Sequence, residues 1–95
     1  MNQYEALYVI VPNIDEEATK ATIEKFKGIA ESNAAEISAV DEWGKRRLAY
    51  AIDYKTEGYY VLMTFASAPE FPAELERNFK NDERIMRYLV TRKEA

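Results

Sequence analysis

The feature that most constrains the fold is the order in which strand-like and helix-like patterns of apolar residues follow one another. Runs rich in β-branched and aromatic residues predict strands, and apolar residues three or four positions apart predict helices. Pro12-Asn13 closes the first strand, and Leu75 and Phe79 lie one turn apart in the second helix. The order is strand (residues 4–11), helix (15 to about 32), strand (36 to about 54), strand (58–66), helix (beginning near Ser67) and strand (85–91).

This order predicts the ferredoxin-like fold, an α+β sandwich of the βαββαβ type. Two strand–helix–strand units with right-handed crossovers place both helices on one face of a four-stranded antiparallel sheet, with strand order 4-1-3-2. A chain of 95 residues has room for one hydrophobic core, so we expect a single domain over residues 1–95. The second and fourth strands then form the edges of the sheet.

Both predicted helices begin with recognisable capping signals. Asn13 or Asp15 can cap the first helix, and Glu16 and Glu17 stand in its first turn, where the helix dipole favours anions. Ser67 can cap the second helix, with the glutamate three residues later reaching back to it. The second helix is therefore expected to start directly after Ser67.

Alternation along the first and last strands divides their side chains between two faces. The tyrosine-bearing faces are predicted to turn toward the helices, and they comprise Tyr4, Ala6, Tyr8, Ile10, Met86, Tyr88 and Val90. Leu7, Val9 and Leu89 then lie on the uncovered face, where an exposed apolar strip is typical of a partner surface. A few exposed aliphatic residues are also ordinary on a folded protein, and this alternative stays open.

The second strand changes phase along its length. Ile37 sits at odd phase, whereas Leu48 and Ile52 sit at even phase. One extra residue in the strand accounts for such a change, and Gly44 is the natural site for this bulge.

The bulge sets the expected directions of the neighbouring side chains. Beyond it, Lys45, Arg47 and Ala49 are predicted to share the uncovered face, while Arg46 points toward the edge or the helices. Trp43, directly before the bulge, either anchors a partner or packs over a helix end.

Basic residues are concentrated in two segments of a chain whose formal net charge is −4. Residues 43–55 hold four cations and one acid, and residues 84–93 hold four cations and no acid. Both segments fall on predicted strands, while the acids fall mainly on predicted helices and their ends. Clustered cations are typical of surfaces that meet nucleic acid, and a random scatter of surface charge is the alternative.

The composition narrows the chemistry. The chain has no histidine and no cysteine, which removes the commonest general base, the thiol nucleophile and the ordinary ligands of zinc. We therefore expect no enzyme activity, no metal and no cofactor. No apolar run approaches the ~18 residues of a membrane span, and the N-terminus leads into a strand pattern without a secretory signal. These features predict a cytoplasmic protein.

One stretch of the sequence is distinctive enough to compare with a known family. The string 44–52, which reads GKRRLAYAI, and the following Gly58-Tyr59-Tyr60 closely resemble ribosomal protein six of the bacterial small subunit. Tyr4-Glu5, Pro12-Asn13 and residues 84–90 extend the resemblance over nearly the whole chain. The resemblance implies the ferredoxin-like fold and a structural role in the ribosome. It also implies binding to small-subunit ribosomal RNA as a heterodimer with ribosomal protein eighteen.

Two groups of residues are the candidates for these contacts. RNA contacts are expected from basic residues of the edge strands, namely Lys45, Arg46, Arg47, Arg84, Arg87, Arg92 and Lys93. Contacts with the partner protein are expected from Leu7, Val9, Trp43, Ala49 and Leu89. The resemblance places Arg46, Arg47 and Arg87 among the RNA or partner contacts without separating the two roles.

An autonomous RNA-recognition domain of the same topology is the alternative function. Its third strand would carry ring-stacking aromatic residues next to a cation and a glycine, but here Glu57 precedes Gly58. Tyr59 and Tyr60 point to opposite faces, so at most one of them can stack on a base. A small phosphate-ester or acyl-phosphate hydrolase on the same scaffold is a third interpretation, and no glycine-rich phosphate loop supports it.

Overall fold

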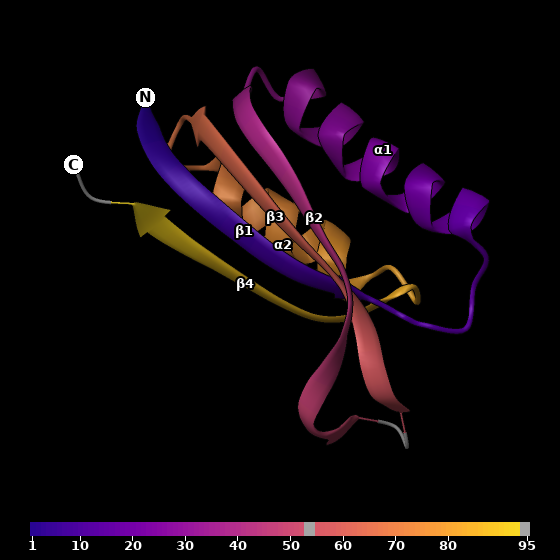
Figure 1. Cartoon of the computed structure of the whole chain (residues 1–95). Coiled ribbons are helices and arrows are strands. Elements are labelled where there is room, and N and C mark those ends of the chain that lie inside the picture. The colour runs from indigo at the N-terminus through magenta and orange to yellow at the C-terminus, as the bar shows by residue number, and fades with distance from the viewer. Residues whose placement is uncertain (53–54, 94–95) are drawn as a thin grey trace.

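A computed structural model of the chain contains four strands and two helices among the residues it describes, in the predicted order (Figure 1). It describes residues 1–52 and 55–93, and for 49–52 and 55 the strand assignment alone. The elements are β1 Asn2–Ile10, α1 Glu16–Ser32, β2 Glu36–Ile52, β3 Lys55–Ser67, α2 Phe71–Lys80 and β4 Ile85–Lys93.

The four strands form one antiparallel sheet in the order β2-β3-β1-β4. This is the predicted order 4-1-3-2 counted from the other edge, so the ferredoxin-like α+β fold is confirmed. β1 lies in the middle and pairs with β3 and β4, whereas β2 and β4 are the edges. In Figure 1 the uncovered face of the sheet is toward the viewer, and α2 lies behind the sheet.

The core lies between the sheet and the two helices and is centred on Tyr8. The Tyr8 ring lies 5.5 Å from the ring of Phe26 in α1 and 4.9 Å from that of Phe79 in α2. Because one side chain of β1 contacts both helices, the helices must cover the same face of the sheet. The predicted inward residues of β1 are all buried, namely Tyr4, Ala6, Tyr8 and Ile10.

The two helix starts differ in how well the sequence predicts them. The Asp15 carboxylate accepts a hydrogen bond from the Ala18 N–H at 2.7 Å, which confirms Asp15 as one of the two expected caps. The predicted cap of α2 is wrong, because Ser67 is the last residue of β3 and pairs with Asn2 of β1. The helix begins only at Phe71, and its N-cap residue makes no side-chain capping bond.

The β2–β3 hairpin is longer than expected and extends beyond the rest of the sheet in Figure 1. β3 begins at Lys55, three residues before the predicted start, and Arg47 pairs with Glu57 inside the hairpin. Of the predicted turn, Asp53 and Tyr54 lie outside the described residues. The hairpin therefore extends the part of β2 that holds the basic residues beyond the ends of β1 and β4.

The Tyr8 hydroxyl is buried and has no hydrogen-bond partner among the described residues, and burial raises the pKa of Tyr8 above its ordinary value. Tyr8→Phe keeps the ring and removes an unpaired polar group, so we expect the free energy of unfolding to rise by about 1 kcal/mol. Chemical denaturation measures this change. Tyr4→Phe is the matched control, because the Tyr4 hydroxyl accepts a bond from Asn2 at 3.2 Å and its loss should lower stability slightly. A Tyr8→Phe variant less stable than the parent would contradict the prediction.

Candidate partner and nucleic-acid interface

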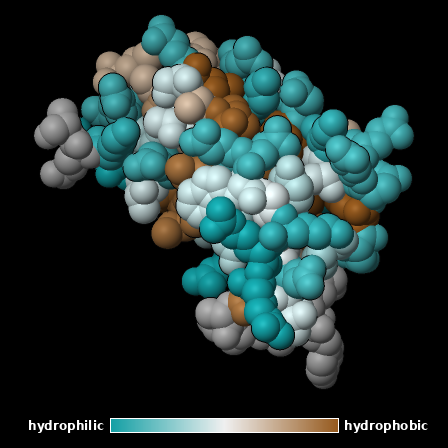
Figure 2. Space-filling model, in the orientation of Figure 1, coloured by the Kyte–Doolittle hydropathy of each residue, from teal (hydrophilic) through white to brown (hydrophobic). Residues whose placement is uncertain are grey.

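The uncovered face of the sheet carries a band of apolar side chains across its middle strands. Strand register places Leu7 between Leu62 of β3 and Leu89 of β4, and Val9 between Tyr60 and Arg87. Leu7, Val9, Tyr60, Arg87, Tyr88 and Leu89 line a shallow hollow of about 300 Å³. Leu89 is 59% exposed, and Figure 2 shows apolar and weakly polar residues between hydrophilic ones on this face.

The predicted apolar strip is only partly exposed. Leu7 is half-buried and Val9 is buried, so the expectation of an exposed Val9 is wrong. The reason lies in Gly58, where a Cβ would overlap the Val9 Cγ1 atom. The missing side chain lets Val9 sink toward the neighbouring strand. Val9 therefore forms the floor of the hollow.

A register shift near the start of β4 alters the predicted inward set of that strand. The pairing of β1 with β4 shifts between Val9 and Ile10. Ile85, instead of the expected Met86, packs against the core, and the Met86 sulfur lies 3.6 Å from the Cβ position at Gly58. Tyr88 and Val90 keep their predicted inward positions.

Two register shifts in the first part of β2 decide which way the basic residues point. The shift between Glu42 and Gly44, with Gly44 at φ +83°, confirms the predicted bulge. A second shift, between Ile37 and Ala39, was not predicted. Each extra residue reverses the faces of the strand, so two of them restore the original phase.

The expected directions of the cations are consequently reversed. Lys45 pairs with Tyr59 and lines a hollow with Ile14 and Thr19 at the start of α1, so it lies on the helix side. Alternation places Arg47 on that side too, and Arg46 on the uncovered face opposite Gly58. The side chain of Ala49 lies outside the described residues.

Trp43 stands at the bulge and joins an aromatic stack on the uncovered face. Its ring lies 6.3 Å from that of Tyr60 at an interplanar angle of 9°, and the Arg46 guanidinium carbon lies 5.1 Å from the Trp43 ring centroid. The interpretation in which Trp43 packs over a helix end is therefore wrong. Trp43 remains 41% exposed, so the stack extends the apolar band onto β2. Tyr60 and Leu62 were missing from the expected partner surface, and the register of β3 against β1 is what reveals them.

The other predicted RNA-binding residues do not gather in one patch. Arg87 lines the hollow, whereas Arg92 donates a hydrogen bond to Asn2 at 3.3 Å and lies with Lys93 at the far end of β4. Of the seven predicted RNA-binding residues, Arg46 and Arg87 lie next to the apolar band on the uncovered face, at the end of the sheet where the hairpin extends.

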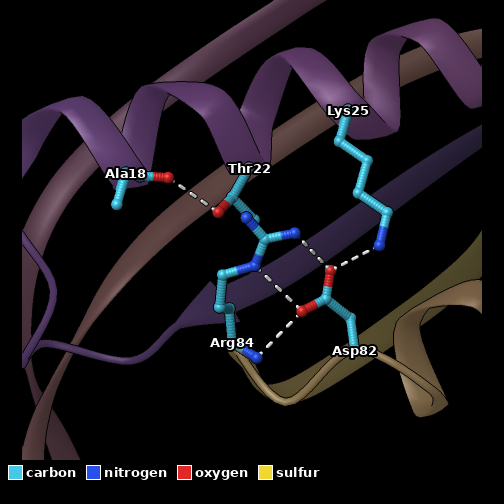
Figure 3. Close-up of polar contacts among 5 residues, drawn as sticks. All are labelled: Ala18, Thr22, Lys25, Asp82 and Arg84. Carbon is cyan, nitrogen blue, oxygen red and sulfur yellow. Dashed lines mark hydrogen bonds and ion pairs between the residues drawn. The ribbon is translucent and has the colours of Figure 1, made fainter.

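Arg84 belongs to an ion cluster around the buried Asp82 carboxylate on the helix side (Figure 3). Its guanidinium donates to both oxygens of Asp82 at 3.1 and 3.0 Å, and its backbone N–H donates at 2.9 Å. Lys25 of α1 contacts the same carboxylate at 2.7 Å. Burial opposes ionisation, but the bonds from Arg84 and Lys25 outweigh it and hold the pKa of Asp82 well below its usual range. The cluster ties α1 to the turn before β4.

The sequence model of the family "Ribosomal protein S6" matches residues 3–92. The chain belongs to the ribosomal protein S6 family. It is 50% identical over 94 residues to the small ribosomal subunit protein bS6 of Clostridium novyi, with 99% of each chain covered. The bS6 protein of Caldanaerobacter subterraneus is 48% identical over 92 residues, with 97% of each chain covered. The crystal structure of 30S ribosomal protein S6 from Thermotoga maritima superposes with a TM-score of 0.93 at 30% identity, covering 97% of this chain and 87% of that one.

As a member of the S6 family the chain is a structural constituent of the small ribosomal subunit, located in the bacterial cytoplasm, and not an enzyme. The resemblance to ribosomal protein six, inferred mainly from residues 44–52, is thereby confirmed. Within residues 1–52 and 55–93, no helix is long and apolar enough to cross a membrane. The same part of the chain holds no group of three or more carboxylates arranged to bind a metal ion.

Asp82→Asn tests the ion cluster. The variant loses charge-assisted hydrogen bonds in a buried site, so we expect the free energy of unfolding at pH 7 to fall by about 2 kcal/mol. Because the pKa of Asp82 is lowered in the folded state, its contribution is present above the unfolded pKa of about 4 and is lost as the pH falls further. The difference in stability between the parent and Asp82→Asn, measured from denaturation curves, should therefore stay constant from pH 7 to about pH 4 and begin to narrow below that, because it is lost completely only at the much lower pH where Asp82 titrates in the folded protein. The exposed neighbour Glu83, changed to Gln, is the control, and curves that stay parallel would refute this account.

Gly58→Ala tests the floor of the hollow. Because the new Cβ would overlap Val9, we expect the substitution to lower the free energy of unfolding by about 2 kcal/mol. Gly28→Ala makes the same change in α1, where a Cβ meets no atom within 4 Å, and should stabilise the helix by about 1 kcal/mol. Thermal and urea denaturation measure both variants. Equal effects of the two substitutions would contradict the proposed packing of Val9.

Proposed function

We propose that this protein binds small-subunit ribosomal RNA together with ribosomal protein eighteen, and that the uncovered face of the sheet is the shared binding surface. The observation that carries the proposal is the apolar band on this face, with Arg46 and Arg87 at the side of the hairpin. Helices cover the opposite face of the sheet. Because the helices do not cover the apolar band, a partner protein can bind to it.

The apolar band has the composition of a protein-binding surface. It comprises Leu7, Val9, Trp43, Tyr60, Leu62 and Leu89. Aromatic residues beside aliphatic ones are typical of the centre of an interface, and tryptophan and tyrosine are common among the residues that contribute most to binding. A partner that covers the band removes Leu89 and Trp43 from water, which favours association.

The charge of the chain argues that RNA binding is shared with the partner. Affinity for RNA grows with the number of phosphates neutralised, and the net charge of −4 disfavours tight binding by the chain alone. Arg46 and Arg87 adjoin the apolar band, and Lys45 and Arg47 lie on the other face of the same hairpin. Arg92 and Lys93 are exposed at the far end of β4. Arg84 is assigned a structural role, because Asp82 binds its guanidinium.

An autonomous RNA reader is the competing function, because Tyr60 of β3 lies on the uncovered face. In this structure Trp43 stacks on the Tyr60 ring, so a base would have to compete with an existing stack. Binding of small-subunit ribosomal RNA with and without ribosomal protein eighteen separates the two functions. Tight binding only when both proteins are present supports the shared mechanism, and equally tight binding by the chain alone supports the autonomous reader.

Charge reversal at Arg46 and Arg87 tests the RNA side of the surface. Each variant, Arg46→Glu or Arg87→Glu, is expected to weaken ternary assembly about tenfold or more. Each should also reduce the slope of the logarithm of the binding constant against the logarithm of the salt concentration by about one unit, the contribution of one phosphate contact. Filter binding at two salt concentrations measures both quantities. Lys27→Glu, on the exposed side of α1, makes the same charge change away from this face and should have little effect. Variants that assemble as well as Lys27→Glu would exclude Arg46 and Arg87 from the RNA contact.

A further inference from the structure

The ring of Trp43 contacts both an aromatic residue and a cation on the uncovered face. It lies nearly parallel to the Tyr60 ring, with the ring centroids 6.3 Å apart and an interplanar angle of 9°. The guanidinium carbon of Arg46 lies over the Trp43 ring, 5.1 Å from its centroid. A cation at this distance from the face of an indole ring is attracted by the electrons of the ring. The contact therefore joins the apolar band to one of the predicted RNA-binding residues.

The sheet holds the Trp43 ring in place through Tyr60. Tyr60 is half-buried and lines the hollow on the uncovered face together with Leu7 and Val9. Offset parallel rings attract each other, so the Trp43 ring rests on a neighbour that the middle strands hold. Trp43 itself is 41% exposed and is not part of the core. Its ring is thus a fixed surface at the edge of the sheet.

Within the described part of the chain, Arg46 has no carboxylate to hold it. Its cross-strand neighbour is Gly58, which has no side chain. Carboxylates bind the guanidinium groups of Arg77 and Arg84, whereas no salt bridge within residues 1–52 and 55–93 includes Arg46. Arg46 is exposed, and attraction to a ring leaves the N–H donors of a guanidinium able to bind a phosphate.

We infer that Trp43 is a positioning residue for the RNA contact: its ring, stacked on Tyr60, holds the Arg46 guanidinium in place before RNA binds. The inference rests on the proposed function and names the residue that orients the arginine. An exposed arginine loses rotamer freedom when it contacts a phosphate. Where a ring has already restricted the side chain, less freedom is lost on binding, so the affinity for RNA is higher.

A double-mutant cycle between Trp43 and Arg46 tests this role. Trp43→Leu, Arg46→Gln and the double variant are compared with the parent chain for binding to small-subunit ribosomal RNA. Ribosomal protein eighteen is present at a saturating concentration, established for each variant by calorimetric titration. We expect Trp43→Leu to raise the dissociation constant for RNA about three- to fivefold in the parent chain. In the Arg46→Gln chain the same substitution should change it less than about twofold.

Two further variants control for other roles of the Trp43 side chain. Trp43→Phe keeps an aromatic ring at this position and should retain most of the affinity for RNA. Leu89→Ala also removes an exposed apolar side chain from the uncovered face, but at the opposite edge of the sheet. Its effect on RNA binding should therefore be the same in the parent and Arg46→Gln chains. Thermal denaturation establishes that each variant is folded.

The outcomes distinguish the inference from the function on which it rests. If Trp43→Leu causes equal losses with and without Arg46, or no loss, the positioning role is refuted and the proposed function stands. An Arg46→Gln variant that binds RNA as well as the parent chain has the same meaning. If the parent chain binds no RNA together with ribosomal protein eighteen, both are refuted. A loss that depends on Arg46 and that Trp43→Phe largely avoids supports the inference.

Discussion

The contact of one central strand with both helices is the constraint on which the rest of the structure depends. Tyr8 of β1 packs against Phe26 of α1 and Phe79 of α2, and the Phe79 ring stacks in turn on Tyr88 of β4. Since both helices must meet the same face of β1, they cannot also cover the other face. An uncovered sheet face with apolar residues on it is therefore a direct consequence of how the core is built.

The backbone of β2 then decides which charges this uncovered face presents. Two extra residues, one near Ser38 and one at Trp43, each reverse the alternation of the strand. Together they bring Arg46 to the uncovered face and leave Lys45 with the helices. The same bulge frees Trp43 from a cross-strand partner, and its ring lies against Tyr60. A local irregularity of the backbone thus assembles the aromatic and cationic part of the surface.

The uncovered face explains how an acidic chain can serve in a ribonucleoprotein. Its helix surfaces carry many acids, among them Glu16, Glu17 and Glu24, and these face away from the apolar band. In the proposed function, the two arginines beside the band contact RNA, and a basic partner on the same face supplies further positive charge. What this face can bind depends on where its charges lie as well as on their sum.

Periodicity along the sequence determined the elements, their order and the ferredoxin-like fold, because the repeat of apolar residues directly reflects which side of a strand or helix is buried. The tertiary structure alone decided the faces of Arg46 and Lys45, since an extra residue in a strand shows only when its pairing with the neighbouring strand is known. It also decided that Val9 sinks over Gly58 and that Arg84 binds Asp82. Val9 and Gly58 lie far apart in the chain, and the Asp82 carboxylate that holds Arg84 also binds Lys25 of α1, 57 residues away, so no local pattern records these arrangements.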